Sequence, residues 1–204
     1  MQTRVVDYLV RVVADLGVRH IFGVDGANIE DLYDAVFDTA HDLTAVVAKH
    51  EFGAATMADG YARSTGGFGV VAATSGGGAM NLVAGLAESF ASRVPVLALV
   101  GQPPTASAGH GAFQDTSGRA GTIDAARVFG AITRYCARVE AAADLPEQVS
   151  RALGAGGPRG GPRGGGGGAP PGGWWRVCHG GRAWGWGPDQ PARAPEPGKR
   201  TIRL

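Results

Sequence analysis

The chain has 204 residues, of which 44% are hydrophobic, and a net charge of +1, so it is long enough for one domain with its own core. Its two cysteines indicate neither a disulfide framework nor a metal cluster. Charged residues interrupt the first 17 positions, and no stretch is apolar enough for a membrane span, so we expect no signal peptide and no membrane association. A cytoplasmic location is the default expectation.

The composition changes abruptly near residue 154. Residues 1–153 carry a net charge of −5 and residues 154–204 carry +6, and the second piece holds 17 of the 35 Gly and all four Trp. The near-neutral total therefore joins two unlike pieces and indicates no partner. Because Gly and Pro at this density cannot pack a core, we expect residues 154–204 to form a disordered tail.

Residues 1–153 alternate between helical and strand-like patterns. Apolar residues at helical spacing predict helices near residues 5–16, 28–37, 51–64, 80–92, 124–129 and 142–153. Short, mostly apolar runs predict strands at residues 18–24, 43–48, 69–74 and 94–101. This alternation is typical of an α/β fold with an open, mostly parallel sheet and helices on both faces.

The segments that follow these strands are the candidate site. In open parallel sheets, ligands bind beyond the carboxyl ends of the strands. Four segments have that position, so we expect them to lie along one edge of the sheet: residues 24–26, 50–51, 74–76 and 101–103.

Glu51 is the unusual residue at this edge, because Ala54, Ala55 and Ala58 follow it on the same side of a predicted helix. A buried carboxylate must be paired, protonated or used in chemistry. A Glu in the first turn of a helix can also simply support the helix dipole or form a capping box. Taken alone, Glu51 is compatible with both interpretations.

The other polar features are equally ambiguous by themselves. The Gly-rich turn at residues 74–81 can present backbone N–H groups to an anion or only permit tight packing, and it has no Walker lysine and no GxGxxG spacing. His50 and His110 have no second ligand at a metal-like spacing, and Asp25 and Asp115 are loop acids that solvent can stabilise.

The order of five segments is more specific than any of them alone: FGVDG, HEFGAATMADGYARSTG, ATSGGGAMNLVAGLAES, VPVLALVGQPP and GAFQD. Together they resemble the N-terminal pyrimidine-binding (PYR) domain of thiamine-diphosphate enzymes, in particular the acetolactate synthase-like group. The resemblance covers about residues 4–153. It implies that Glu51 binds N1′ of the cofactor's aminopyrimidine, which promotes removal of the C2 proton from the thiazolium and attack on a 2-keto acid.

The resemblance also implies further site residues. Thr74, Ser75, Gly76 and Asn81 match a turn beside the aminopyrimidine, Val24, Asp25 and Gly26 match a loop on the substrate side, and Phe113 and Gln114 match a segment that lines the active site. Three positions depart from the family pattern: Gly77 and Asp25 each replace the usual Pro, and Asp115 replaces Glu. We therefore expect a looser turn at residue 77, and Asp25 leaves the substrate class open.

Family members hold Mg²⁺ and the diphosphate on a second domain through a Gly-Asp-Gly motif, which this chain does not contain. The resemblance thus implies that the chain holds only the aminopyrimidine half, with Mg²⁺ on another domain or partner, and leaves FAD dependence unassigned. Relatives also continue from a helix near residue 153 into the last strand of the domain. Because the Gly-rich tail stands there, we expect the domain to lack that strand.

Three interpretations of the chain follow from this pattern. It is the N-terminal portion of an acetolactate synthase-like enzyme, frameshifted at about residues 153–156; or the PYR subunit of a split, two-chain decarboxylase; or a non-catalytic remnant. The first two require a homo-oligomer or a separate diphosphate-binding chain. A short subunit whose RGG-like tail binds nucleic acid is a weaker alternative, since the α/β piece gives it no support.

Overall fold

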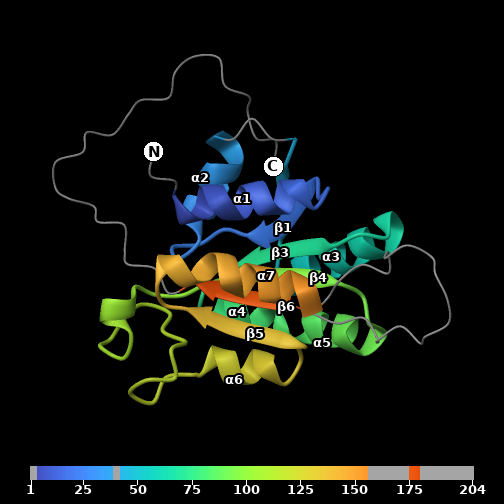
Figure 1. Ribbon diagram of the computed structural model, residues 1–204. Helices are drawn as coiled ribbons and strands as arrows, with labels where there is room; N and C mark the ends of the chain where they lie inside the picture. The colour runs from blue at the N-terminus through green and yellow to red at the C-terminus, as the bar shows by residue number, and fades with distance from the viewer. Residues whose placement is uncertain (1–3, 39–41, 156–174, 180–204) are drawn as a thin grey trace.

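A six-stranded parallel sheet forms the centre of the protein, seen in a computed structural model that describes residues 4–38, 42–155 and 175–179 (Figure 1). The strand order is β2-β1-β3-β4-β6-β5. The strands are β1 (His20–Val24), β2 (Thr44–Val47), β3 (Gly69–Ala73), β4 (Val96–Gly101), β5 (Tyr135–Val139) and β6 (Trp175–His179).

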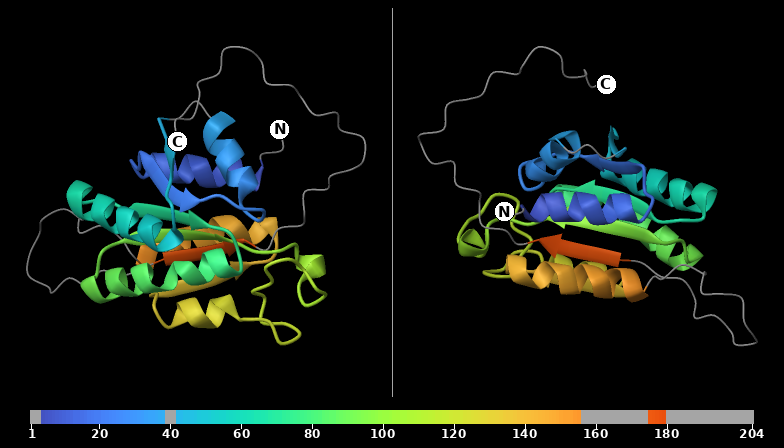
Figure 2. Two further views of the ribbon diagram at one scale, coloured as in Figure 1. Left: turned by 180° about the vertical axis from the view of Figure 1, so that it is seen from behind. Right: turned by 45° about the horizontal axis from the view of Figure 1, so that its top comes forward.

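Helices cover both faces of this sheet. On one face lie α1 (Val5–Asp15), α2 (Glu30–Asp38) and α7 (Leu145–Ala155), and on the other lie α3 (Glu51–Thr65), α4 (Gly77–Asn81), α5 (Val83–Ser92) and α6 (Ala125–Gly130). The right-hand view of Figure 2 shows α1 and α7 in front of the sheet, and the left-hand view shows α3, α5 and α6. Two short 3₁₀ turns, Thr105–Ser107 and Ala142–Asp144, complete the described elements.

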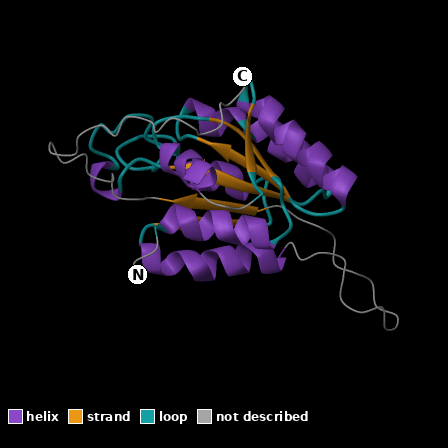
Figure 3. Ribbon diagram, turned by 90° about the horizontal axis from the view of Figure 1, so that it is seen from above, coloured by secondary structure: helices purple, strands orange, loops and turns teal. Residues whose placement is uncertain are grey.

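Two hydrophobic cores fill the spaces between these layers, one on each side of the strands (Figure 3). Every residue of β3 and β4 is buried, because helices cover both of their faces, whereas β2 at the edge is only partly buried. Strands buried on both faces read as continuous apolar runs, which is why the sequence predicts them well. The expected α/β fold with an open parallel sheet is confirmed.

The strand connections diverge between β1 and β3. From β1 the chain passes through α2 on one face to reach β2, whereas from β3 it passes through α4 and α5 on the opposite face to reach β4. Connections that leave neighbouring strands toward opposite faces separate at the carboxyl ends, where α/β proteins bind ligands. The loops after β1 and β3 meet there.

The last two strands differ from the sequence-based expectation. No strand is expected at residues 135–139 or after residue 153, yet β6 lies between β4 and β5 and pairs in parallel with both. Strand β6 thereby supplies backbone partners to one edge of each neighbour, and its sequence WRVCH contains aromatic and β-branched residues that suit a strand. The structure therefore has a strand after residue 153, at a place where the sequence predicts none. The disorder expected at 156–174 and 180–204 lies outside the described residues.

Candidate functional site

Three loops at the carboxyl edge of the sheet are joined by side-chain hydrogen bonds. The Asn28 amide Nδ2 donates to Oγ of Ser75 over 2.7 Å, and the Asn28 backbone N–H donates to Oγ1 of Thr74 over 3.3 Å. The Thr74 hydroxyl in turn donates to Oε1 of Gln114 over 3.4 Å. The loops after β1 and β3 and the long loop after β4 therefore form one polar surface.

Glu51 lies at the first position of α3 beside this surface, and only 8% of the residue is exposed. Its oxygen Oε2 accepts a hydrogen bond from Nδ2 of Asn81 over 2.9 Å. The helix is capped by its neighbour, because Nδ1 of His50 accepts from the backbone N–H of Phe52. Glu51 therefore forms no capping box, and its carboxylate instead faces α4 and the turn after β3.

Glycines at this turn leave no room for side chains. A Cβ on Gly78 would lie 2.9 Å from Cγ2 of Thr74 and 3.0 Å from Oε1 of Glu51. Gly76 has φ +68° and ψ −131°, a conformation that only glycine adopts readily, and a Cβ there would lie 2.7 Å from Cβ of Gln114. Gly77, in contrast, faces open space: a Cβ built on it would contact no atom within 4 Å. The absence of a side chain at this position therefore creates no packing gap.

The expected substrate-side loop packs against the turn after β3. Val24 is half-buried against the core beneath α3, and Asp25 is exposed, with Oδ1 accepting from the backbone N–H of Gly26 over 2.7 Å. A Cβ on Gly26 would lie 2.8 Å from Cβ of Thr74, so this glycine lets the loops after β1 and β3 approach each other. Asp25 thus places a carboxylate at the rim of the site.

Tyr33 is a site neighbour that the sequence reasoning missed, because its helical spacing on α2 is also typical of a core residue. Its hydroxyl lies against Gly23 of β1, is buried, and has no hydrogen-bond partner among the described residues. Burial raises the pKa of the phenol strongly, and the negative charges of Asp25 and Glu51 raise it further. The hydroxyl is therefore a neutral donor close to both acids.

The long loop after β4 brings Gln114 to the site but not Phe113 or Asp115. Gln114 adopts φ +53° and contacts Thr74, whereas Phe113 is 72% exposed. The Asp115 carboxylate accepts from the backbone N–H groups of Gly109 over 2.6 Å and Ser117 over 2.7 Å. Burial alone would raise the pKa of Asp115, but these bonds and the nearby Arg138 outweigh it and lower the pKa. Asp115 thus stabilises its own loop.

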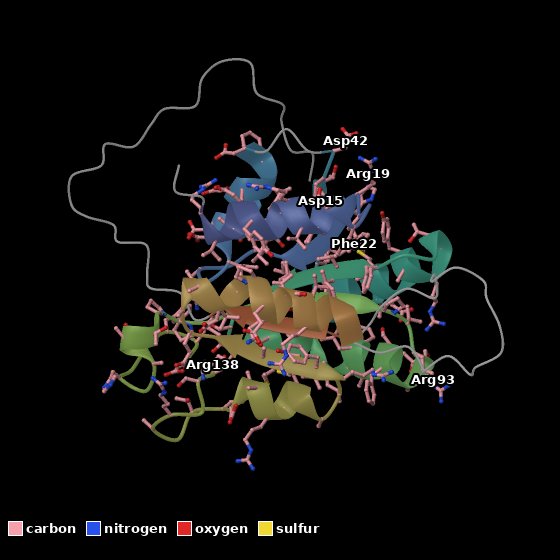
Figure 4. The ribbon with its side chains drawn as sticks, in the orientation of Figure 1. Asp15, Arg19, Phe22, Asp42, Arg93 and Arg138 are labelled. Atoms are coloured by element: carbon pink, nitrogen blue, oxygen red, sulfur yellow. The ribbon has the colours of Figure 1, made fainter. Side chains whose placement is uncertain are left out.

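A second polar network anchors this loop to β5. Arg138 donates to the Gln102 side chain over 3.1 Å and to the Ser117 carbonyl over 2.7 Å, and Gln102 also bonds Thr116. Figure 4 shows Arg138 at the loop end of the sheet, whereas Arg19 and Asp42 form an ion pair at the opposite end. The segment at 101–103 therefore supports the loop that carries Gln114.

The chemistry of this set suits a flat ring with hydrogen-bonding nitrogens. The site offers a buried carboxylate with one oxygen unpaired among the described residues, two hydroxyls, three side-chain amides and two closely packed glycines. None of the expected site residues is Lys or Arg, so the set gives no counter-charge to a diphosphate. In the described part of the chain, no three His, Cys, Asp or Glu side chains lie together as metal ligands would. No described helix could span a membrane.

Comparisons with a family profile and with individual proteins point to the same family. The sequence profile of the thiamine pyrophosphate enzyme N-terminal TPP-binding domain matches residues 3–121. A probable acetolactate synthase large subunit of Methanocaldococcus jannaschii is 41% identical over 137 residues, which cover 67% of this chain and 22% of that protein.

Two further relatives show the same pattern. An acetolactate synthase of Arthrospira platensis is 42% identical over 139 residues, covering 67% of this chain and 23% of that protein. The acetolactate synthase isozyme 3 large subunit of Escherichia coli is 35% identical over 147 residues, covering 72% and 24%. The chain thus spans less than a quarter of the length of each relative.

Proposed function

The chain belongs to the family of thiamine pyrophosphate enzymes, whose N-terminal TPP-binding domain it matches, and on this premise we propose that it binds the aminopyrimidine half of thiamine diphosphate (thiamine pyrophosphate). The observation that carries the proposal is the Glu51 carboxylate, which is buried against Gly78 of the glycine turn and keeps Oε1 without a partner among the described residues. Such an oxygen can share a proton with a ring nitrogen.

The other site residues fit the same ligand. Gly76 and Gly78 let Gln114, Thr74 and Glu51 pack directly against the turn, so that the Gln114 amide and the Thr74 hydroxyl lie close to the Glu51 carboxylate. When bound, thiamine diphosphate would supply a thiazolium that adds to the carbonyl carbon of a 2-keto acid and accepts the electron pair released at that carbon. Glu51 would hold or release a proton at the pyrimidine nitrogen, and its exclusion from water would strengthen that interaction.

The diphosphate and Mg²⁺ require residues from elsewhere. The site contains acids but no Lys or Arg, and an unneutralised diphosphate next to Asp25 and Glu51 would be repelled. We therefore assign Mg²⁺ and the diphosphate to a further domain or a partner chain, in a homo-oligomer or a two-chain enzyme.

For the whole enzyme we propose decarboxylation and carboligation of 2-keto acids, as the N-terminal portion of an acetolactate synthase-like protein. The second candidate is the PYR subunit of a split, two-chain decarboxylase. The coding DNA separates the two. The missing domains in another reading frame downstream favour the first, and a neighbouring gene with its own start favours the second.

Fragment binding followed by NMR tests the proposal with the chain as it exists. We expect thiamine and its hydroxymethyl-aminopyrimidine fragment to shift the amide resonances of residues 24–28, 51, 74–81 and 114. The thiazole fragment, which lacks the aminopyrimidine, is the control and should leave these resonances unchanged. Binding of the thiazole alone, or thiamine shifts confined to other parts of the chain, would contradict the proposed site.

A further inference from the structure

The two oxygens of the Glu51 carboxylate have different surroundings. Oε2 accepts the 2.9 Å hydrogen bond from Asn81, which belongs to α4 and not to the helix that carries Glu51. Oε1 has no hydrogen-bond partner among the described residues and lies 3.0 Å from the point where a side chain on residue 78 would begin. One oxygen is therefore held by a hydrogen bond, while the other packs against Gly78 and has its hydrogen-bonding capacity unused among the described residues.

We propose that Asn81 is a positioning residue, which fixes Oε2 of Glu51 so that Oε1 is the oxygen presented to the pyrimidine nitrogen. The proposal rests on the proposed function and deepens it. One of the two amide N–H bonds of Asn81 is used on Glu51, so this role stands beside the expectation that Asn81 also contacts the cofactor, for which the second N–H and Oδ1 remain.

The physical reason is preorganisation. The terminal torsion of a glutamate side chain has a broad, roughly two-fold energy profile, so an unrestrained carboxylate presents either oxygen and many orientations. A donor on one oxygen fixes the plane of the group and the direction of the other oxygen's lone pairs. Because the donor comes from the short helix after the glycine turn, the same bond also ties that turn to α3.

The groups around Glu51 leave Asn81 as its donor. Tyr33 and Asp25 interact electrostatically with the same region, but neither makes a hydrogen bond to Glu51 among the described contacts. The His50 side chain is used on the N–H of Phe52. Removing the Asn81 amide therefore removes the side-chain hydrogen bond that the described residues give to this carboxylate.

The first part of the test uses stability against pH and needs no ligand. Asn81→Asp keeps the shape but places a second carboxylate against Oε2, and two carboxylates at this distance share one proton, so the pair's pKa in the folded state rises. A raised folded-state pKa stabilises the fold below the unfolded value of about 4 and loses that effect as pH increases. We expect Asn81→Asp to unfold more easily than wild type at pH 7, with the difference shrinking toward pH 4.

Asn28→Asp is the matched control, because the Asn28 side chain contacts the Ser75 hydroxyl and not a carboxylate. We expect its stability difference from wild type to vary much less between pH 7 and pH 4. If Asn81→Asp behaves like Asn28→Asp, the contact with Glu51 does not exist in solution and the proposal is overturned, whatever the pyrimidine experiment gives.

The second part measures the role of the contact with the aminopyrimidine fragment as the probe. Asn81→Ala removes the donor without adding a charge, and we expect it to weaken fragment binding by about tenfold, as the loss of one hydrogen bond to a charged group predicts. Equal affinity in wild type and Asn81→Ala would overturn the positioning role. If wild type binds no fragment, the proposed function fails, and that outcome is distinguishable because the pH-dependent stability of Asn81→Asp is measured without ligand.

Discussion

At the scale of single residues, the candidate site depends on the Glu51 carboxylate, whose burial is not explained by an interaction with the helix dipole alone. A surface Glu in a first turn stabilises a helix by at most about 1 kcal/mol and needs no burial. Glu51 is instead buried and accepts a hydrogen bond from Asn81 of α4. The start of α3 is capped by the neighbouring His50 and not by Glu51. These surroundings fit a role in proton transfer better than a role in stabilising the start of α3.

Glu51→Gln is the direct test of that role. Glutamine keeps the shape but cannot exchange a proton with a ring nitrogen, so we predict slower hydrogen–deuterium exchange at C2 of thiamine diphosphate bound to the enzyme reconstituted with its diphosphate-binding domain. The expected loss is about a hundredfold or more, typical of a missing general acid–base group. NMR measures the exchange, and cofactor affinity should fall much less. An unaltered rate would restrict Glu51 to a structural role in α3.

The buried hydroxyl of Tyr33 gives a prediction about stability. A buried hydroxyl without a partner costs free energy, so Tyr33→Phe should raise the free energy of unfolding by about 1 kcal/mol. Tyr61→Phe is the matched control, because that hydroxyl accepts from the backbone N–H of Arg19 over 3.0 Å, and its removal should lower stability. Urea unfolding measures both. A loss of stability in Tyr33→Phe would indicate that its hydroxyl has a partner in solution.

At the scale of elements, the sequence predicts well those segments whose environment is uniform. The strands at 69–74 and 94–101 are apolar throughout because both faces are covered, and the periodicity of α1 and α3 is regular. Strand β5 is not predicted from the sequence because Arg138 interrupts its apolar pattern. In the structure, Arg138 anchors the loop after β4 through Gln102. Strand β6 is not predicted from the sequence because Gly-rich and Pro-rich segments flank it on both sides.

The same limit applies to the site. Glu51 and the glycine turn can be found from motif order, since their residue types and spacing carry the signal. The bond from Asn81 to Glu51 and the buried hydroxyl of Tyr33 depend on side-chain directions across different elements, which no local pattern encodes.

Strand β6 yields a prediction at this scale. Val177 pairs with Leu99 on one side and Ala137 on the other, so Val177→Pro removes a backbone donor from within the sheet and should destabilise the domain by about 3 kcal/mol or more. Hydrogen exchange should become faster in Tyr135–Val139, with a smaller change in β1 and β3, which serve as internal controls. Unchanged exchange in β5 would favour the original expectation that no strand follows α7.

At the scale of the whole molecule, the chain covers less than a quarter of the length of each compared acetolactate synthase. Its described residues form one α/β unit whose site accounts for a carboxylate and a pyrimidine surface but supplies no counter-charge to a diphosphate. Catalysis by this family's chemistry requires both halves of the cofactor to be held at once, because the geometry between the two rings sets the proton transfer. If the chain holds only the aminopyrimidine half, as we propose, it should bind the ring without turnover.

We accordingly predict that the purified chain, with added thiamine diphosphate and Mg²⁺, does not decarboxylate pyruvate or related 2-keto acids above a control without protein. In the proposed mode of binding, this chain gives the diphosphate no counter-charge, and the Asp25 and Glu51 carboxylates would oppose its approach to the site. Carbon dioxide release is the measurement. Addition of a diphosphate-binding partner domain should restore turnover, and Glu51→Gln should abolish that restored activity. Turnover by the chain alone would show that it binds the whole cofactor, and would overturn the assignment of the diphosphate to another domain.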